Sequence, residues 1–172
     1  ATHLPYADNL FDKALAQLVL NQIPAASRAV REMRRVTKPG GTVAACVWAA
    51  GKGNQRNHLF WEAAMAVDPA AAQWRETAGD YGRKSGLSAL WNECRLQEIR
   101  EAGLVVEVEF NSFDDFWLPH LAGQAQAGAY VKSLSADRRD ALRNRLRQEF
   151  LGTQPEGRFS LRAKAVAVRG TC

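Results

Sequence analysis

Two continuous apolar runs lie near the start of the chain. Residues 14–20 are apolar except at Gln17, and residues 42–48, "TVAACVW", form a second run. Apolar residues without alternation are typical of strands buried on both faces, as in a parallel sheet. We therefore predict one buried strand over Lys13 to Leu20 and a second over Thr42 to Trp48.

Between these runs the spacing is helical over residues 25–36. One face collects the apolar side chains, namely Ala26, Ala29, Val30, Met33 and Val36. Pro39 limits the helix, because the residue before a proline disfavours the helical region, and Gly40 with Gly41 supplies a turn. Strand, helix and strand in this order predict a right-handed crossover that makes the two strands parallel.

The loop after the second strand, "AAGKGNQRN" at residues 49–57, follows the carboxyl end of a predicted buried strand. Open α/β sheets bind ligands at this end, so the loop is a candidate binding region. Further along, the pattern predicts an amphipathic helix over residues 57–67, helix and loop over residues 68–84, and helical spacing over residues 85–103.

The remainder of the chain alternates strand and helix patterns. Residues 104–110, "LVVEVEF", alternate valine with glutamate and predict a strand with one wet face. Ser135 caps the clearest helix of the chain, which we expect to run to residue 150. Residues 158–170 alternate again and predict a last strand, antiparallel to the preceding one. We see no domain boundary and predict a single truncated domain over residues 1–172.

The composition is that of an ordinary globular protein, with 47% hydrophobic and 24% charged residues. No apolar run is long enough for a membrane span, and the first residues lack a signal-peptide pattern. The net charge of +5 comes from basic residues interleaved with acidic ones, which favours a solvated surface over a nucleic-acid groove. Three cysteines without a CxxC pair favour a reduced, cytoplasmic setting.

The residues that most often carry chemistry give few signals. His3, His58 and His120 lack the spacing of metal ligands, so we expect no metal site. His120 either faces a substrate pocket or, as we favour, is a satisfied or surface histidine. Cys46 lies in a predicted buried strand and is expected to be inert. Several aromatic residues either line an apolar substrate cavity or, as we favour, pack in the core: Trp48, Phe60, Trp61, Trp91, Phe113, Phe116 and Trp117.

Three stretches carry a resemblance to a known family. They are "LPYADNLFD" at residues 4–12, "LVLNQIP" at residues 18–24, and "REMRRVTKPGGTVAACVW" at residues 31–48. In this order they resemble class I S-adenosylmethionine-dependent methyltransferases, in the group related to the ubiquinone-biosynthesis enzymes. The resemblance implies an α/β fold with a partial Rossmann-like methyltransferase sheet and flanking helices. In the family strand order 3-2-1-4-5-7-6, the chain would supply strands four to seven.

The same resemblance implies S-adenosylmethionine as cofactor and a small molecule as methyl acceptor. The family's GxGxG loop and ribose-binding acid would precede Ala1, and "GKGN" at Gly51 to Asn54 has the wrong spacing to replace the loop. We therefore expect impaired or absent activity, or alternatively a non-catalytic oligomerising or binding module. The residues that would line the cofactor are Ala1, Ala16, Gln17, Leu18, Asn21 and Gln22. Gln17 is singled out as a buried amide that needs partners, and no catalytic residue is assigned.

Two partner hypotheses follow. The strand over Lys13 to Leu20 would be an apolar sheet edge, and such edges pair with other chains, which predicts a homodimer through this strand. A less favoured reading is nucleic-acid binding by the arginine-rich helix from Asp137 to Arg147.

Overall fold

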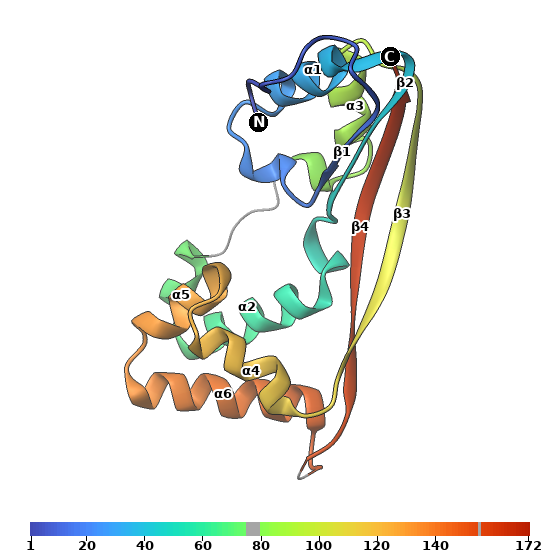
Figure 1. The fold of residues 1–172 in the computed structure, drawn as a ribbon. Helices are drawn as coiled ribbons and strands as arrows, with labels where there is room; N and C mark the ends of the chain where they lie inside the picture. Colours follow the sequence, from blue (N-terminus) through green and yellow to red (C-terminus); the bar gives the residue numbers. More distant parts are fainter. Residues whose placement is uncertain (75–79, 155) are drawn as a thin grey trace. The chain divides into compact units, whose positions relative to one another are not determined.

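The structure, a computed structural model, describes residues 1–74, 80–154 and 156–172. The chain divides into two compact units (Figure 1). The sheet unit lies within residues 1–54, 78–105 and 164–172, and the helical unit within residues 55–77 and 106–163. The prediction of one domain stays a prediction.

The sheet unit begins with the predicted crossover. Strand β1 (Phe11–Gln17) is followed by the 3₁₀ helix η1 (Leu20–Gln22), helix α1 (Ala26–Val36) and strand β2 (Thr37–Trp48). β1 and β2 are parallel, with Ala14 opposite Val43. All five residues predicted for the inner face of α1 are buried, which confirms the helical pattern.

The prediction that the double glycine makes a turn before the second strand is wrong, because β2 begins at Thr37 and both glycines lie within it. Gly40 has a φ of +76°, which L side chains rarely adopt. A Cβ on Gly41 would lie 2.6 Å from the Thr37 side chain and 2.7 Å from the Asp12 carbonyl oxygen. The pairing of β1 with β2 shifts register between Phe11 and Lys13 at this point. The glycines therefore let the two strands approach each other where the pairing is irregular.

The sheet has four strands in the order β1-β2-β4-β3, which equals the expected order of family strands four, five, seven and six (Figure 1). Strand β4 (Phe159–Thr171) is antiparallel to β2. Strand β3 (Gln97–Phe110) is antiparallel to β4, because three contacts fit a single register. These contacts join Gly170 to Gln97, Lys164 to Gly103, and Ser160 to Glu107.

The core of the sheet unit lies between the sheet and two helices, α1 and α3 (Gly86–Glu93). Trp91 is fully buried there, and its indole N–H donates to the Val43 carbonyl oxygen at 3.2 Å. The prediction that β1 is buried on both faces is wrong, since Leu15 is 73% exposed. The strand lies at the end of the sheet, and its outer face carries none of the core residues.

The expected helix over residues 85–103 is wrong in its second half. α3 ends at Glu93, and β3 begins at Gln97. Cys94 and Leu96 are both buried in the core, and Arg95 between them has a φ of +60°, so the chain turns sharply there. The expectation of one wet face on residues 104–110 also fails, because consecutive residues Leu104, Val105 and Val106 are all exposed.

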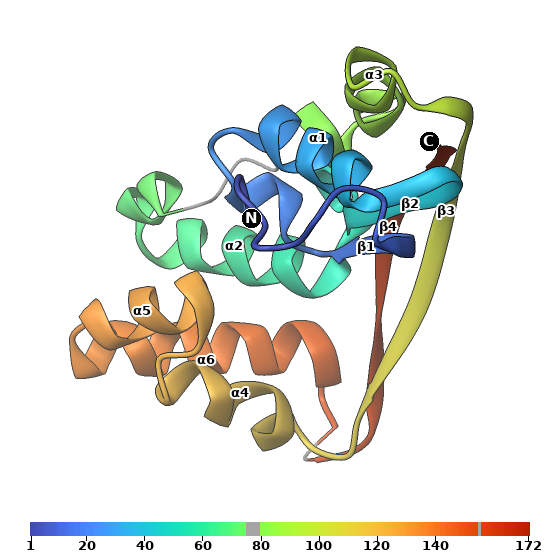
Figure 2. The same cartoon turned by 45° about the horizontal axis from the view of Figure 1, so that its top comes forward.

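The helical unit contains α2 (Gln55–Val67), η3 (Pro69–Gln73), α4 (Phe113–Leu121), α5 (Ala125–Ser133) and α6 (Ala136–Leu151). α6 packs against α2 and α4, and α4 packs against α5 (Figure 2). Ser112 and Ser135 cap α4 and α6, each accepting a hydrogen bond from a backbone N–H in the first turn. α5 lies outside the helices that the sequence pattern predicts. None of the helices within the described residues is long and apolar enough to cross a membrane.

Candidate functional site

Two hollows lie in the sheet unit, and the first runs along β1. This β1 groove, of about 400 Å³, is lined by the N-terminal segment, β1 and α1. Arg35 holds the N-terminal segment in place by donating to the carbonyl oxygens of Tyr6 (2.8 Å) and Leu4 (3.1 Å). Of the predicted cofactor-lining residues, the groove brings together Ala1, Ala16 and Gln17.

The other three predicted residues do not line the groove. Leu18 is partly buried, has a φ of +54°, and donates its N–H to the Cys46 carbonyl oxygen at 2.9 Å. Asn21 and Gln22 are exposed within η1. Gln17 itself is exposed, so its prediction as a buried amide is wrong. The cause is that Gln17 shares the exposed face of β1 with Leu15, whereas Ala14 and Ala16 on the other face pack against the core.

The β1 groove fits S-adenosylmethionine poorly on its own. Its described lining is apolar except for a few groups such as Lys13 and Gln17, and includes no carboxylate and no glycine. Gripping a ribose requires an acceptor for its hydroxyls, and close contact with a nucleotide favours glycine in the backbone. These residues therefore supply a wall for apolar atoms and not a complete nucleoside site.

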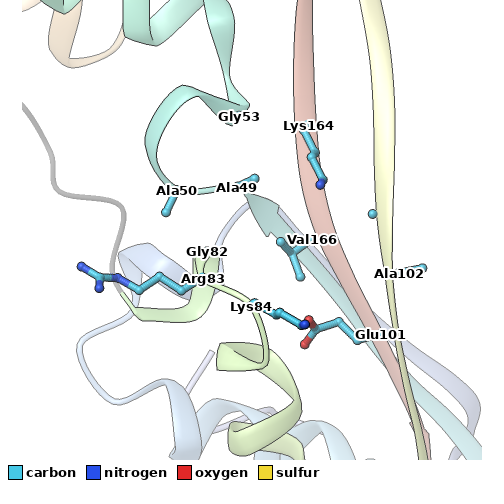
Figure 3. Close-up of a pocket in the computed structure, with 11 residues that line it drawn as sticks. Ala49, Ala50, Gly53, Gly82, Arg83, Lys84, Glu101, Ala102, Lys164 and Val166 are labelled. Atoms are coloured by element: carbon cyan, nitrogen blue, oxygen red, sulfur yellow. The ribbon is translucent and has the colours of Figure 1, made fainter.

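The second hollow, the β2 cleft, has a volume of about 630 Å³ and lies beyond the carboxyl end of β2 (Figure 3). Four segments of the sheet unit form it: the loop after β2, the turn before α3, the middle of β3, and β4. Its lining residues are Ala49, Ala50, Gly53, Gly82, Arg83, Lys84, Glu101, Ala102, Gly103, Lys164 and Val166. The predicted binding loop over residues 49–57 thus supplies one wall of a real cleft.

Backbone hydrogen bonds and small residues join this loop closely to the neighbouring segments. The Ala49 N–H donates to the Lys164 carbonyl oxygen at 2.8 Å, and the Ala50 N–H donates to the Gly82 carbonyl oxygen at 2.9 Å. A Cβ on Gly82 would lie 2.6 Å from the Trp48 carbonyl oxygen, so a larger residue cannot take this place without movement of the backbone. The contacts fix the loop after β2 relative to β4 and the turn before α3.

Glu101 is the acid among the described lining residues. Its carboxylate accepts hydrogen bonds from the Ser85 N–H (3.0 Å), the Ser88 N–H (3.3 Å) and the Ser88 hydroxyl (2.7 Å). Partial burial alone would raise the pKa of Glu101, but the bonds from Ser88 and Ser85, with the charge of Lys84, outweigh it and lower the pKa. Glu101 is therefore ionised at neutral pH and secures the start of α3.

Two lysines bring positive charge to the cleft. Lys84 points toward the Glu101 carboxylate, and the Lys164 side chain extends from β4 into the hollow (Figure 3). A Cβ on Gly103 would lie 3.0 Å from the Lys164 Cε, so the glycine opposite gives this lysine room to lie over β3. Arg83 also belongs to the lining.

The histidine and the aromatic residues singled out by the sequence lie elsewhere. In the helical unit, His120 is buried, stacks on Phe60 with ring centroids 4.9 Å apart, and has Nδ1 2.9 Å from the Phe116 carbonyl oxygen. Burial, and then the charge of Arg56, lowers its pKa to about 4. His120 is therefore a satisfied core histidine, as we favoured.

Core packing also accounts for most of the aromatic residues. All of them except Trp48 belong to one of the two buried cores. Cys46 is partly buried in β2. No group of three metal-binding side chains occurs among residues 1–74, 80–154 and 156–172.

Comparison with known proteins supports the family resemblance for the first part of the chain. Residues 1–45 match the family model described as a methyltransferase domain. The resemblance to the class I methyltransferases is confirmed. A demethylmenaquinone methyltransferase of Mycolicibacterium vanbaalenii is 35% identical over 72 residues, which are 42% of this chain and 32% of the relative. A 2-phytyl-1,4-naphtoquinone methyltransferase of Synechocystis is 37% identical over 78 residues, 45% of this chain and 33% of the relative. The chain thus matches about a third of the length of these methyltransferases.

Solved structures extend the methyltransferase likeness to the whole fold. A protein assigned as a type II methyltransferase from Anaeromyxobacter dehalogenans superposes with a TM-score of 0.57 at 19% identity, covering 98% of this chain and 66% of that one. A protein assigned as a methyltransferase from Bacillus halodurans gives 0.52 at 15% identity, covering 99% and 73%. At such identities the likeness concerns the fold alone.

Sequence reasoning missed the charged half of the β2 cleft. Glu101 fell within an expected helix, and Lys164 was one of several alternating polar residues of the last strand. Their placement depends on the register between β3 and β4, for which the local sequence offers no signal.

Proposed function

We propose that residues 1–172 form the acceptor-side half of an S-adenosylmethionine-dependent methyltransferase that acts on a small molecule. The sheet order β1-β2-β4-β3, with a parallel crossover followed by an antiparallel strand, is the observation that carries the proposal. The match of residues 1–45 to the methyltransferase domain supports it. So do the relatives, which are named as methyltransferases of demethylmenaquinone and of 2-phytyl-1,4-naphtoquinone.

We propose further that these residues by themselves hold the cofactor weakly. No GxGxG segment occurs within residues 1–172, and the β1 groove offers no carboxylate for a ribose. Methyl transfer from a sulfonium needs little beyond binding and positioning, so weak binding of the cofactor impairs activity directly. Further strands on the outer side of β1 would supply the glycine loop and the carboxylate that binds the ribose.

Calorimetric titration of the isolated chain with S-adenosylmethionine tests this. We expect a Kd weaker than about 100 μM. The second arm joins the glycine-loop half of one of the relatives to the N-terminus of the chain, and there we expect tight cofactor binding and methyl transfer to a small acceptor. Micromolar binding by the isolated chain contradicts the weak-binding proposal. Tight binding by the joined protein without transfer to any small-molecule acceptor contradicts the proposed activity.

A second candidate is an oligomerising module, and the edge of the sheet favours it. β1 is an outer strand, and no described strand pairs with its outer side. Its Leu15 is 73% exposed, and the neighbouring Leu10 is 50% exposed. A second copy presenting the same edge would bury these side chains and pair the free backbone groups, giving a symmetric dimer.

Sedimentation at micromolar concentration separates the two states. We expect a dimer for the natural sequence and a monomer for Leu15→Lys, which places a charge in the interface. Leu118→Lys in α4 is the matched control, because Leu118 is 57% exposed and belongs to the helical unit. A stable monomer of the natural chain, or equal effects of the two substitutions, contradicts the dimer.

The nucleic-acid hypothesis receives less support. In α6, Arg138 pairs with Asp68 at 3.2 Å, and Arg143 pairs with Asp114 at 3.0 Å. Arg139 donates to the Leu134 carbonyl oxygen at 3.0 Å. Arginines engaged within the helical unit offer less free charge to phosphates.

A further inference from the structure

The β2 cleft carries more positive than negative charge. Lys84 and Lys164 line it, against the single described acid Glu101. Neither Lys84 nor Lys164 forms an ion pair with any residue that the structure describes. The positive charge therefore exceeds what the cleft itself neutralises.

Glu101 offsets one of the positive charges, because its carboxylate stays ionised while both of its oxygens accept hydrogen bonds from Ser85 and Ser88 at the start of α3. Lys84 points toward this carboxylate and acts on it through space (Figure 3). Lys164 stands on the opposite side, where no acid lines the hollow. The region between the two lysines is the place where an anion is attracted most strongly.

The backbone around this region is shaped to let a ligand approach closely. Glycine or alanine occupies six of the eleven lining positions: Ala49, Ala50, Gly53, Gly82, Ala102 and Gly103. Gly103 in particular leaves the space into which Lys164 extends. The volume of about 630 Å³ is within the usual size of small-molecule sites. A cleft with small walls and cationic ends accepts a small molecule with a negatively charged group.

We propose that the β2 cleft binds the anionic group, a phosphate or a carboxylate, of a small-molecule ligand between Lys84 and Lys164. That this ligand is the methyl acceptor rests on the proposed function, since the cleft lies beyond the carboxyl end of a central strand, where α/β sheets bind ligands. Anion binding itself rests on the cleft alone. Both anions suit lysine ammonium groups, which bind them as point charges.

Nuclear magnetic resonance titration of the whole chain measures this binding without cofactor. Inorganic phosphate is one probe and acetate the other, each added at constant ionic strength. We expect saturable shifts of the backbone amides at residues 49–53, 82–84 and 101–103, with a Kd of about 1–10 mM for the preferred anion. Tighter binding of phosphate identifies a phosphate ligand, and equal or tighter binding of acetate identifies a carboxylate.

Lysine variants test the assignment to the cleft. Lys164→Met keeps the length of the side chain without its charge and is expected to weaken binding about tenfold. The double variant Lys84→Met with Lys164→Met is expected to abolish saturation. Lys13→Met is the matched control, an exposed lysine of β1 outside the cleft. All three positions are exposed, so the fold is preserved, and circular dichroism checks this.

The results separate the two proposals. Shifts that do not saturate below about 50 mM with either anion, shifts confined to other residues, or equal weakening by Lys13→Met overturn the anion site. None of these outcomes concerns methyl transfer. Conversely, saturable binding that depends on Lys164, in a chain that never transfers methyl groups when supplied with a glycine-loop half, keeps the anion site and removes the acceptor assignment.

Discussion

The two units differ in how completely their buried polar side-chain groups are paired. In the sheet unit these groups are paired: the Thr37 hydroxyl donates to the Met33 carbonyl oxygen at 2.7 Å, and the Trp91 indole donates to Val43. In the helical unit, the buried hydroxyl of Tyr130 and the Nε of Arg139 have no partner among the described residues. Unpaired buried groups are costly, so these two positions weaken the helical unit, although its His120 is paired with the Phe116 carbonyl oxygen. Among the described residues of the sheet unit no such unpaired buried side-chain group occurs.

Removing a side chain that both packs and pairs is expected to have the largest effect. Trp91→Ala leaves a cavity in the sheet-unit core and removes the hydrogen bond to the Val43 carbonyl oxygen, which should cost about 3–5 kcal/mol of unfolding free energy. Urea denaturation measures the loss. Trp48→Ala is the control, because Trp48 is 36% exposed and belongs to neither core. Equal losses from both substitutions would contradict the central place of Trp91.

Acid is expected to weaken the helical unit through His120. Its pKa is about 4 in the folded chain against an ordinary 6.5, so the unfolded chain takes up a proton first as pH falls. Stability is thus complete above pH 6.5 and decreases by about 2–4 kcal/mol as pH falls toward 4. Unfolding measured at several pH values should show this slope. His120→Phe should flatten it between pH 6.5 and 4, and an unchanged slope would contradict the assignment.

A smaller loss is expected when Glu101 loses its charge. Glu101→Gln keeps the shape of the side chain but weakens the bonds to Ser85 and Ser88, at a cost of about 1–2 kcal/mol. Because the pKa of Glu101 is lowered from 4.5, its contribution is present above that pH and is lost as pH falls below it. Denaturation at pH 7 measures the cost, with Glu109→Gln on exposed β3 as control. A neutral Glu101→Gln would contradict the role of the carboxylate in securing α3.

The smallest change is expected at Tyr130. Tyr130→Phe removes a buried hydroxyl that has no partner among the described residues and leaves the ring contacts with Trp61 and Trp74 in place. The result should range from neutral to about 1 kcal/mol more stable. Thr37→Val in the sheet unit removes a hydroxyl that is paired, and it should be destabilising. Changes in unfolding free energy of opposite sign for Tyr130→Phe and Thr37→Val support the difference between the two units. A clear loss of stability in Tyr130→Phe contradicts it.

The parts of the fold that sequence predicts are those with local causes. α1 follows from one apolar stripe, and α6 follows from the serine that caps it. The helix predicted over residues 97–103 is instead part of β3. Gln97, Glu98 and Arg100 are good helix formers, but pairing with β4 overrides that preference. The candidate site divides in the same way. Its loop is predicted because a glycine-containing segment directly follows a buried strand. Glu101 and Lys164, by contrast, line the same cleft only because of the register between β3 and β4, which depends on the whole sheet.

The outer strands β1 and β3 have a consequence for handling the protein. Pairing of β1 with β1 closes after two copies, but pairing of β1 with the β3 of the next copy repeats without end and builds a fibre. Concentrated solutions of the isolated chain are therefore expected to become more viscous with time and to bind amyloid dyes. Val105→Lys in β3, at a position that is 63% exposed, should prevent this fibre formation.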